Sequence, residues 1–219
     1  MKTISTRLPL AIAATAALAL GAAGCGGSSD NKPAAQTQSR NPADNTPVAS
    51  FASLSGVDTA VAVDPKVLAA LTSLGVAPAP TGKGKLTMTY GPTLAFPITG
   101  GSVKVYDKAK VSPYVTGEVM HQGSGLSFTK GTTKLEVSDF VVDPGASMLT
   151  ATVGGKPGFP LFFLDGSGLK ISKDSAGNSK LDGTKVELTS DAAAALNSTF
   201  KVTAFSPRML IGIAHITAH

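Results

Sequence analysis

Residues 115–153 read VTGEVMHQGSGLSFTKGTTKLEVSDFVVDPGASMLTATV, and this stretch decides the fold class. Apolar and polar residues alternate in four short runs, separated by breaks such as Gly123-Ser124-Gly125 and Pro144-Gly145. Alternation with a period of two is typical of strands with one buried face, whereas Gly and Pro mark turns. We therefore predict four consecutive strands, at residues 114–121, 125–130, 133–142 and 147–153.

The same pattern continues on both sides of this stretch. Further strands are predicted at residues 59–63, 85–90, 94–98, 102–106, 159–164, 168–172, 184–188, 200–205 and 209–217. Phe159, Leu161 and Phe163 mark one buried face, whose predicted partner across a hairpin is the pair Leu169 and Ile171. Long crossover helices are absent, so the predicted fold class is all-β, an antiparallel β-sandwich or flattened barrel with two short helices.

The two predicted helices each follow a strand and a capping residue. Asp64-Pro65 is typical of a helix start and precedes a helix at residues 66–74, while Thr189 or Ser190 precedes an Ala-rich helix at residues 191–197. The segments TAVAVDPKVLAAL (59–71) and TKVELTSDAAAAL (184–196) align without gaps and share five residues. Either the domain contains an internal duplication, or two Ala-rich helices resemble each other by chance.

The N-terminus has the pattern of an export signal. Lys2 and Arg7 precede an apolar run and then small residues, and Cys25, the single cysteine of the chain, follows at once. The segment Ala22-Ala23-Gly24-Cys25 resembles the bacterial lipobox, although Leu is usual where Ala22 stands. We predict a signal peptide at 1–24 and lipid attachment at Cys25; the alternative is an ordinary secretory signal with a stray cysteine.

Composition divides the rest of the chain. Residues 26–50 are rich in Gly, Ser, Pro, Asn and Gln, which predicts a disordered tether, and 51–219 is predicted to be a single β-rich domain. Removal of the signal lowers the net charge from +5 to +3, because Lys2 and Arg7 leave with it. This mild surplus, without a basic stripe, does not indicate a nucleic-acid partner, and no feature indicates an oligomer. The predicted location is extracytoplasmic, anchored to the cell membrane.

Catalytic and metal motifs are weak. His215 and His219 lie four residues apart, but no third ligand lies near them, so two solvated histidines are the simpler interpretation. Two S-x-x-K segments lack the companion motifs of penicillin-binding enzymes. We therefore predict a protein that is not an enzyme, with no metal and no obligatory cofactor.

The segment Val115–Val153 resembles the centre of the HtaA-type domain of actinobacterial surface proteins. The matching residues are Gly117, His121, Gly123, Leu126, Leu135, Val137, Leu149 and Ala151. The resemblance implies a β-sandwich with short helices that binds haem through a histidine and a tyrosine. His121 matches the histidine. The family's tyrosine lies on an N-terminal helix, and helix 66–74 has none, so Tyr90, which precedes a Gly-Pro turn, is the tyrosine we assign to ligand binding.

Two functions compete at this point. The first is a lipid-anchored cell-surface binding module for haem or another apolar or planar ligand, with His121 and Tyr90 at its site. The strand pattern alone places His121 at the end of the apolar face of Val115 and Val119. A histidine there either lines a pocket or forms a hydrogen bond to a turn carbonyl. The second function is a structural or adhesive cell-envelope domain without a small-molecule pocket. A hollow lined by Tyr and His favours the first, and a filled core with an exposed apolar patch favours the second.

The lipid-anchor hypothesis predicts the fate of one variant. Cys25→Ser should move the protein from the membrane fraction into the medium, because the acylated cysteine is the one anchor that the sequence offers. Fractionation of cells followed by immunoblotting measures this shift. A mutant that still sediments with membranes would contradict the hypothesis.

Overall fold

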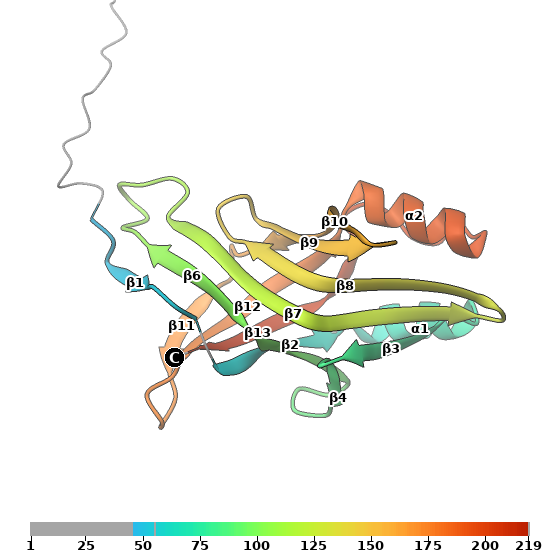
Figure 1. The fold of residues 1–219 in the computed structure, drawn as a ribbon, viewed down its shortest axis with the longest axis horizontal. Coiled ribbons are helices and arrows are strands. Elements are labelled where there is room, and N and C mark those ends of the chain that lie inside the picture. Colours follow the sequence, from blue (N-terminus) through green and yellow to red (C-terminus); the bar gives the residue numbers. More distant parts are fainter. Residues whose placement is uncertain (1–45, 55, 219) are drawn as a thin grey trace, which may run out of the picture. The chain divides into compact units, whose positions relative to one another are not determined.

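Strands β7, β8 and β9 occupy the stretch that decides the fold, and the rest of the sheet continues from them (Figure 1). The computed structural model describes residues 46–54 and 56–218, which belong to the unit Arg40–His219. The predicted signal peptide, Cys25 and most of the predicted tether lie outside the described residues. The strands are β1 (Ala49–Phe51), β2 (Gly56–Val63), β3 (Ala77–Gly82), β4 (Lys85–Thr87), β5 (Thr93–Ile98), β6 (Gly100–Val105), β7 (Val115–Lys130), β8 (Thr133–Asp143), β9 (Met148–Val153), β10 (Lys156–Asp165), β11 (Lys170–Lys173), β12 (Ser179–Leu188) and β13 (Leu210–Ala218).

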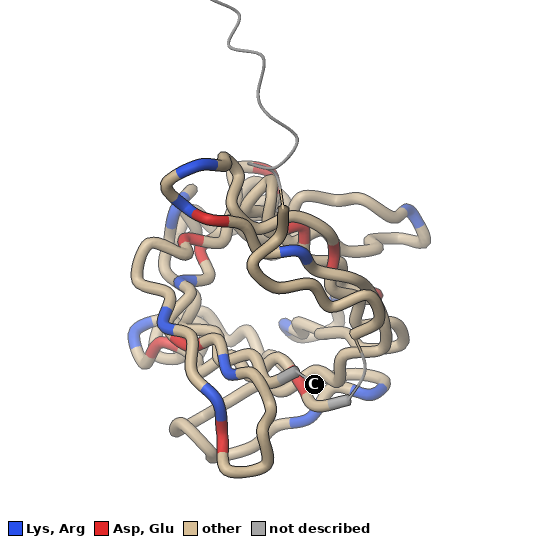
Figure 2. Tube along the Cα trace, turned by 90° about the vertical axis from the view of Figure 1, so that its left-hand side faces the viewer, with Lys and Arg blue, Asp and Glu red and all other residues tan. Residues whose placement is uncertain are grey.

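All of these strands join one sheet through antiparallel pairs, in the order β1-β6-β7-β8-β9-β10-β12-β13-β2-β5-β4, with β3 added to β7 and β11 to β12. The single residue Thr99 connects β5 to β6, and its N–H donates to Met120 O on β7 at 2.8 Å. β5 pairs with β2, and β6 pairs with β7. Because β5 continues directly into β6, the sheet curls into a half-barrel. In Figure 2 the chain curls around a central region. The all-β prediction is confirmed.

The two predicted helices are also present, as α1 (Pro65–Ser73) and α2 (Ser190–Phe200). The Asp64 side chain accepts from Lys66 N at 2.7 Å, and Thr189 Oγ1 accepts from Ala192 N at 3.1 Å, so each helix has the expected cap. Strands β2 and β12 both pair with β13 and run in the same direction. Their helices consequently lie at the same end of the half-barrel (Figure 1). Duplication remains a hypothesis, but the two units do flank one shared strand.

Several predicted boundaries are wrong for identifiable reasons. Residues 114–121 and 125–130 are one strand, because Gly123-Ser124-Gly125 is a bulge in β7 and not a turn. A Cβ on Gly125 would lie 2.6 Å from Val137 O, so this glycine permits close strand packing.

Strand β11 pairs with β12 and not with β10, and Ile171 is 60% exposed, so the predicted hairpin face at Leu169 and Ile171 does not form.

The chain at residues 201–209 is a loop where a strand at 200–205 was predicted. Helix α2 extends to Phe200 and ends at Lys201, which has a left-handed conformation with φ of 54°. Asn197 then holds the loop by bonding both the N–H and the C=O of Phe205, at 3.1 and 2.8 Å. Strands β1 and β3 were not predicted, and β1 begins at Ala49, ahead of the predicted domain start.

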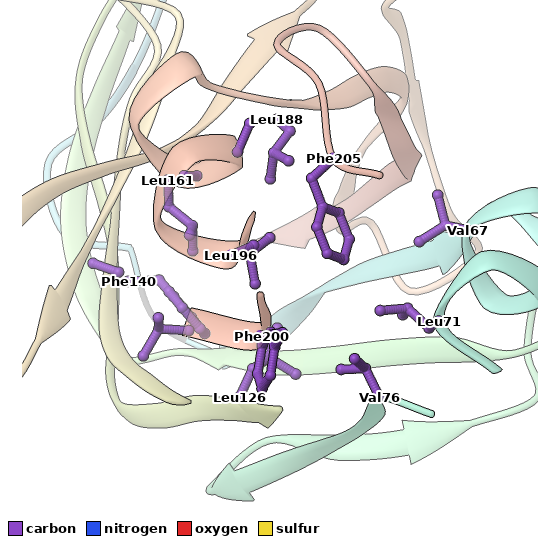
Figure 3. Close-up of a cluster of buried hydrophobic side chains, with 14 of the residues drawn as sticks. Val67, Leu71, Val76, Leu126, Phe140, Leu161, Leu188, Leu196, Phe200 and Phe205 are labelled. Atoms are coloured by element: carbon purple, nitrogen blue, oxygen red, sulfur yellow. The ribbon is translucent and has the colours of Figure 1, made fainter. Parts of the chain in front are cut away.

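The main core lies between the sheet and the two helices (Figure 3). It contains Leu71 of α1, Leu196 and Phe200 of α2, and Phe205 of the loop that follows, all packed against inward-facing strand residues. Phe96 and Phe140 meet edge to face at 5.1 Å, an arrangement typical of packed aromatic pairs. A second, smaller cluster of buried residues comprises Leu54, Ile98, Val103, Val119 and Val142.

Close packing of β13 against β2 generates a stability prediction. A Cβ on Gly212 would lie 2.2 Å from Ala62 O, so Gly212→Ala must push the two central strands apart. We expect it to lower the free energy of unfolding by about 1–3 kcal/mol, measured by urea denaturation. Gly166→Ala is the matched control, because no atom lies within 4 Å of the point that a Cβ would occupy there, and it should change stability by less than about 0.5 kcal/mol. Equal unfolding midpoints for the two variants would contradict this view of the β2–β13 contact.

Candidate functional site

His121 faces the interior of the half-barrel from the middle of β7. It shares this face with Val115 and Val119, as the alternation of the sequence predicts, and its side chain is 1% exposed. Nδ1 lies 3.0 Å from Pro97 O, and Nε2 lies 3.3 Å from Thr59 Oγ1. Because a carbonyl oxygen only accepts, Nδ1 carries the proton, and Nε2 of the neutral ring accepts from the Thr59 hydroxyl. His121 therefore joins β7 to both β5 and β2.

The surroundings of His121 favour its neutral form. Burial lowers its pKa from the ordinary value of 6.5, and the hydrogen bonds to the main chain at Pro97 and Phe96 oppose this effect only in part. A neutral imidazole retains a lone pair on Nε2, which is the atom nearest to Thr59. The ring can thus accept a hydrogen bond or coordinate a metal from this nitrogen if Thr59 gives way.

A cavity of about 180 Å³ lies beside His121 within the half-barrel. Its wall is formed by inward-facing side chains of eight strands of the curled sheet, by both helices, and by residues of β3 and β4. The only polar side chains among its described lining residues are Thr59, His121 and Thr184. No charged side chain is among those lining residues. A lining of this kind offers water few hydrogen-bond partners and favours apolar molecules.

A second, wider cavity of about 480 Å³ occupies the end of the half-barrel opposite the helices. It shares Val142, Leu164, Thr184 and Ile216 with the apolar cavity, so the two meet at this belt of side chains. Its rim is polar and includes Lys108, Ser112, Ser147, Asp165 and Ser167. The interior is consequently apolar at the helix end and polar-rimmed at the other.

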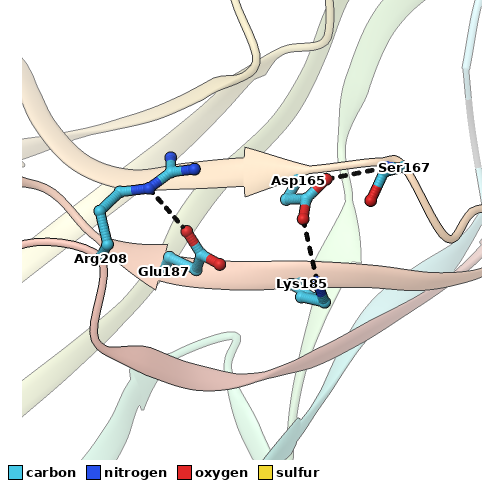
Figure 4. A network of polar contacts seen from close by, with 5 residues as sticks. All are labelled: Asp165, Ser167, Lys185, Glu187 and Arg208. Atoms are coloured by element: carbon cyan, nitrogen blue, oxygen red, sulfur yellow. Dashed lines mark hydrogen bonds and ion pairs between the residues drawn. The ribbon is translucent and has the colours of Figure 1, made fainter.

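The Asp165 carboxylate anchors part of this rim (Figure 4). It accepts from Ser167 N at 2.9 Å and from Lys185 Nζ at 3.1 Å. Hydrogen bonds from the side chain and main chain of Ser167, followed by that from Lys185, lower the pKa of Asp165 to about 2. Nearby, Arg208 Nε lies 3.0 Å from Glu187 Oε2, and the Arg208 guanidinium covers the Phe163 ring at 3.7 Å. These contacts hold the ends of β10 and β12 together.

Tyr90 lies on the outer side of the half-barrel wall. Its ring stacks on His215 at 3.8 Å, and His215 Nδ1 lies 2.8 Å from Asp182 Oδ1. The residues on either side of His215, Ala214 and Ile216, both line the interior cavity, so His215 points outward from β13. The structure therefore does not bring Tyr90 and His121 together, since they belong to opposite faces of the wall.

The other predicted sites have different outcomes. His215 is not solvated, because it is held between Tyr90 and Asp182, whereas His219 lies outside the described residues, as does Cys25. Within residues 46–54 and 56–218, no group of three His, Cys, Asp or Glu side chains could hold a metal ion. In this same part of the chain, no helix is long and apolar enough to span a membrane.

Sequence reasoning found His121 but missed the cavity around it. The cavity wall comes from segments as distant as Thr59 and Ile216, and no local motif connects them. Comparisons of the chain with protein-family models, with curated proteins and with solved structures find no match. The HtaA-like resemblance of residues 115–153 therefore stays a hypothesis.

Burial of a neutral His121 predicts how stability depends on pH. The unfolded chain binds a proton at this histidine near pH 6.5, whereas the folded chain does so only at lower pH, so acidification below about 6.5 destabilises the fold. Between about pH 7 and 5, His121→Gln should lose less unfolding free energy than the wild type, by up to about 1.4 kcal/mol per pH unit. Urea unfolding at both pH values measures the difference. An identical pH dependence in the two proteins would contradict a buried neutral imidazole.

Proposed function

We propose that this chain is an exported, lipid-anchored module that binds an apolar ligand inside its half-barrel. The observation that carries the proposal is the 180 Å³ cavity, whose wall is apolar apart from Thr59, His121 and Thr184. An unfilled apolar space costs stability, because side chains around it lose contacts that a packed core would supply. A ligand that fills the space restores those contacts and adds the free energy of removing its own apolar surface from water.

The competing function, a structural envelope domain, would need no such space. A domain that only packs against other surfaces gains from a filled core, and small-to-large substitutions at Ala195 or Ala214 would fill this cavity. Both alanines line the wall, so the chain has small side chains where larger apolar ones would close the space. This supports ligand binding over a purely structural role.

Haem is a second candidate ligand, because Nε2 of His121 is the one described imidazole nitrogen beside the cavity. Coordination of iron would require Thr59 to release Nε2. Tyr90 cannot share that iron with His121, since the two side chains lie on opposite faces of the wall. In a hemin titration followed at the Soret band, a complex formed in the cavity should change in His121→Ala and stay unchanged in Tyr90→Phe. The opposite pattern would place haem outside the half-barrel.

A cavity-filling substitution tests the proposed function directly. The probe is a naphthalene dye whose fluorescence rises in apolar surroundings, titrated into the full chain carrying Cys25→Ser. Ala195→Phe projects a ring into the cavity and should weaken dye binding by about tenfold or more, which corresponds to roughly 1.4 kcal/mol.

The matched control is Ala194→Phe. Ala194 is the neighbouring residue of α2, is exposed, and does not line the cavity, so its replacement should leave dye binding unchanged. Thermal unfolding of both variants verifies that they fold. Equal dye binding by folded Ala195→Phe and wild type would overturn the proposed site.

A further inference from the structure

The exposed part of the apolar cavity lining lies on β3, on β4 and in the turn before β5. Most of the lining residues are buried or half-buried, and the exposed ones are Pro78 on β3, Leu86 on β4 and Pro92 in the turn before β5. These three residues define a gap that we call the β3–β4 slot. In Figure 1, β3 and β4 lie next to each other below the half-barrel. The lining is most exposed at this slot, which makes the slot the candidate mouth of the cavity.

Two prolines explain why the slot does not close. On β3, Pro78 lies opposite Phe128 and Pro80 opposite Leu126 in the ladder with β7. Opposed residues of an antiparallel ladder alternate between hydrogen-bonded and non-hydrogen-bonded pairs, and a proline can occupy only the second kind. A residue in a non-hydrogen-bonded pair directs its N–H group away from β7, toward the free edge of β3. At residues 78 and 80 that residue is proline, so the N–H group is missing.

The free edge of β3 thus has no donors at residues 78 and 80 for another strand. Strand β4 follows β3 after a short turn, yet it pairs with β5, where Leu86 lies opposite Leu94. A hairpin between β3 and β4 would seal the wall, and the missing N–H groups prevent that ladder. The same two prolines turn their rings into the cavity beside Leu126 and Phe128. They keep the slot open and make its edge apolar.

The outer rim of the slot is apolar and basic. Leu86 is 64% exposed and Met88 is 72% exposed, and both lie on or just after β4. Lys83, in the turn between the two strands, is exposed and forms no ion pair with another described residue, whereas Lys85 lies opposite Ala95 on the outer face of the wall, where the Asp58 carboxylate interacts with it at longer range. Exposed apolar side chains next to the Lys83 ammonium group suit a molecule with an apolar chain and an anionic head.

The dimensions and polarity of the cavity indicate the class of ligand. Its volume of about 180 Å³ is below the roughly 300–1,000 Å³ of pockets that enclose drug-sized molecules. A flat macrocycle or a whole long acyl chain would have to widen it, whereas the end of a single acyl chain needs only a narrow space and no polar partner along its length. The wall provides such a space, since its described lining residues include no charged group.

From these observations we propose that the β3–β4 slot is the port through which the end of one acyl chain of a lipid enters the cavity, leaving its anionic head outside, near Lys83. This inference rests on the proposed function, because it names the ligand and the route for the same cavity. The wide cavity at the polar-rimmed end is the competing route, and the experiment is designed to separate the two.

The test measures the rate at which the full chain carrying Cys25→Ser takes up a conjugated polyene fatty acid, whose fluorescence rises when it leaves water. Leu86→Glu places a carboxylate in the slot and should slow uptake by roughly tenfold. Ile171→Glu is the matched control, because Ile171 is 60% exposed on β11 and lines neither cavity. Lys108→Glu alters the rim of the wide cavity. Both of these variants should take up the probe at the wild-type rate.

A second variant tests the role of the prolines. Replacement of Pro78 and Pro80 together by Val restores two N–H donors to the free edge of β3 and should also slow uptake, whereas Pro157→Val, at an exposed position away from both cavities, should not. Presenting the probe either free or as a chain of a phospholipid in vesicles distinguishes a soluble fatty acid from a membrane lipid as the source.

The outcomes separate the port from the proposed function. Wild-type uptake by Leu86→Glu, or slower uptake by Lys108→Glu alone, would overturn the slot as the port. If the chain binds the naphthalene dye, and Ala195→Phe weakens that binding, but the chain does not bind the fatty acid, then the acyl ligand is wrong. The proposed function would stay intact in that case. Failure of both probes would overturn both.

Discussion

β7 changes partners at its bulge, and the remaining architecture depends on this change. Up to Met120 the strand pairs with β6, and from Ser124 onward it pairs with β3, while β8 pairs with its other edge from Val119 onward except at the bulge. A strand without the bulge would keep one partner and continue a flatter wall, since bulges bend a strand and increase its twist. The bulge also restores the inward orientation of alternate residues, so that His121 and then Leu126 both face the interior. The cavity, its histidine and the β3–β4 slot all lie around this point.

Short-range signals were sufficient for most elements and failed where a distant contact decides the outcome. Alternation located β8 and β9, and capping residues located both helices, because one-sided burial and helix caps leave local patterns. It failed at Gly123-Ser124-Gly125, where glycine serves close approach to Val137 and not a turn. It also failed at Phe205, an aromatic residue in a loop that reads like a strand but is held by Asn197. The alternating prolines of β3 look like a break in the sequence, and the edge that they form becomes visible only beside β7.

The residues of the candidate site were also predictable from the sequence only in part. His121 stands out in the sequence because it continues the apolar face of Val119, and the structure buries it as that pattern implies. Tyr90 has no such pattern, and its position is set by stacking on His215, a residue of the C-terminal strand. The cavity wall is collected from nearly every element, so no contiguous segment could reveal it. Apolar residues that face a cavity and those that face a packed core have the same pattern in the sequence, and only their mutual distances differ.

The position of both helices at one end of the half-barrel divides the molecule into parts with different freedom to vary. At the helix end, α1 and α2 pack into the main core, so an insertion there would disturb many buried contacts. At the other end, the wide cavity is bounded by connections between strands, around Ser112, Gly145 and Ser167, which carry few buried apolar groups. Such connections tolerate changes in length and composition. The half-barrel can therefore serve as a constant scaffold whose open end is rebuilt for new molecular contacts, in nature or by design, without repacking the interior.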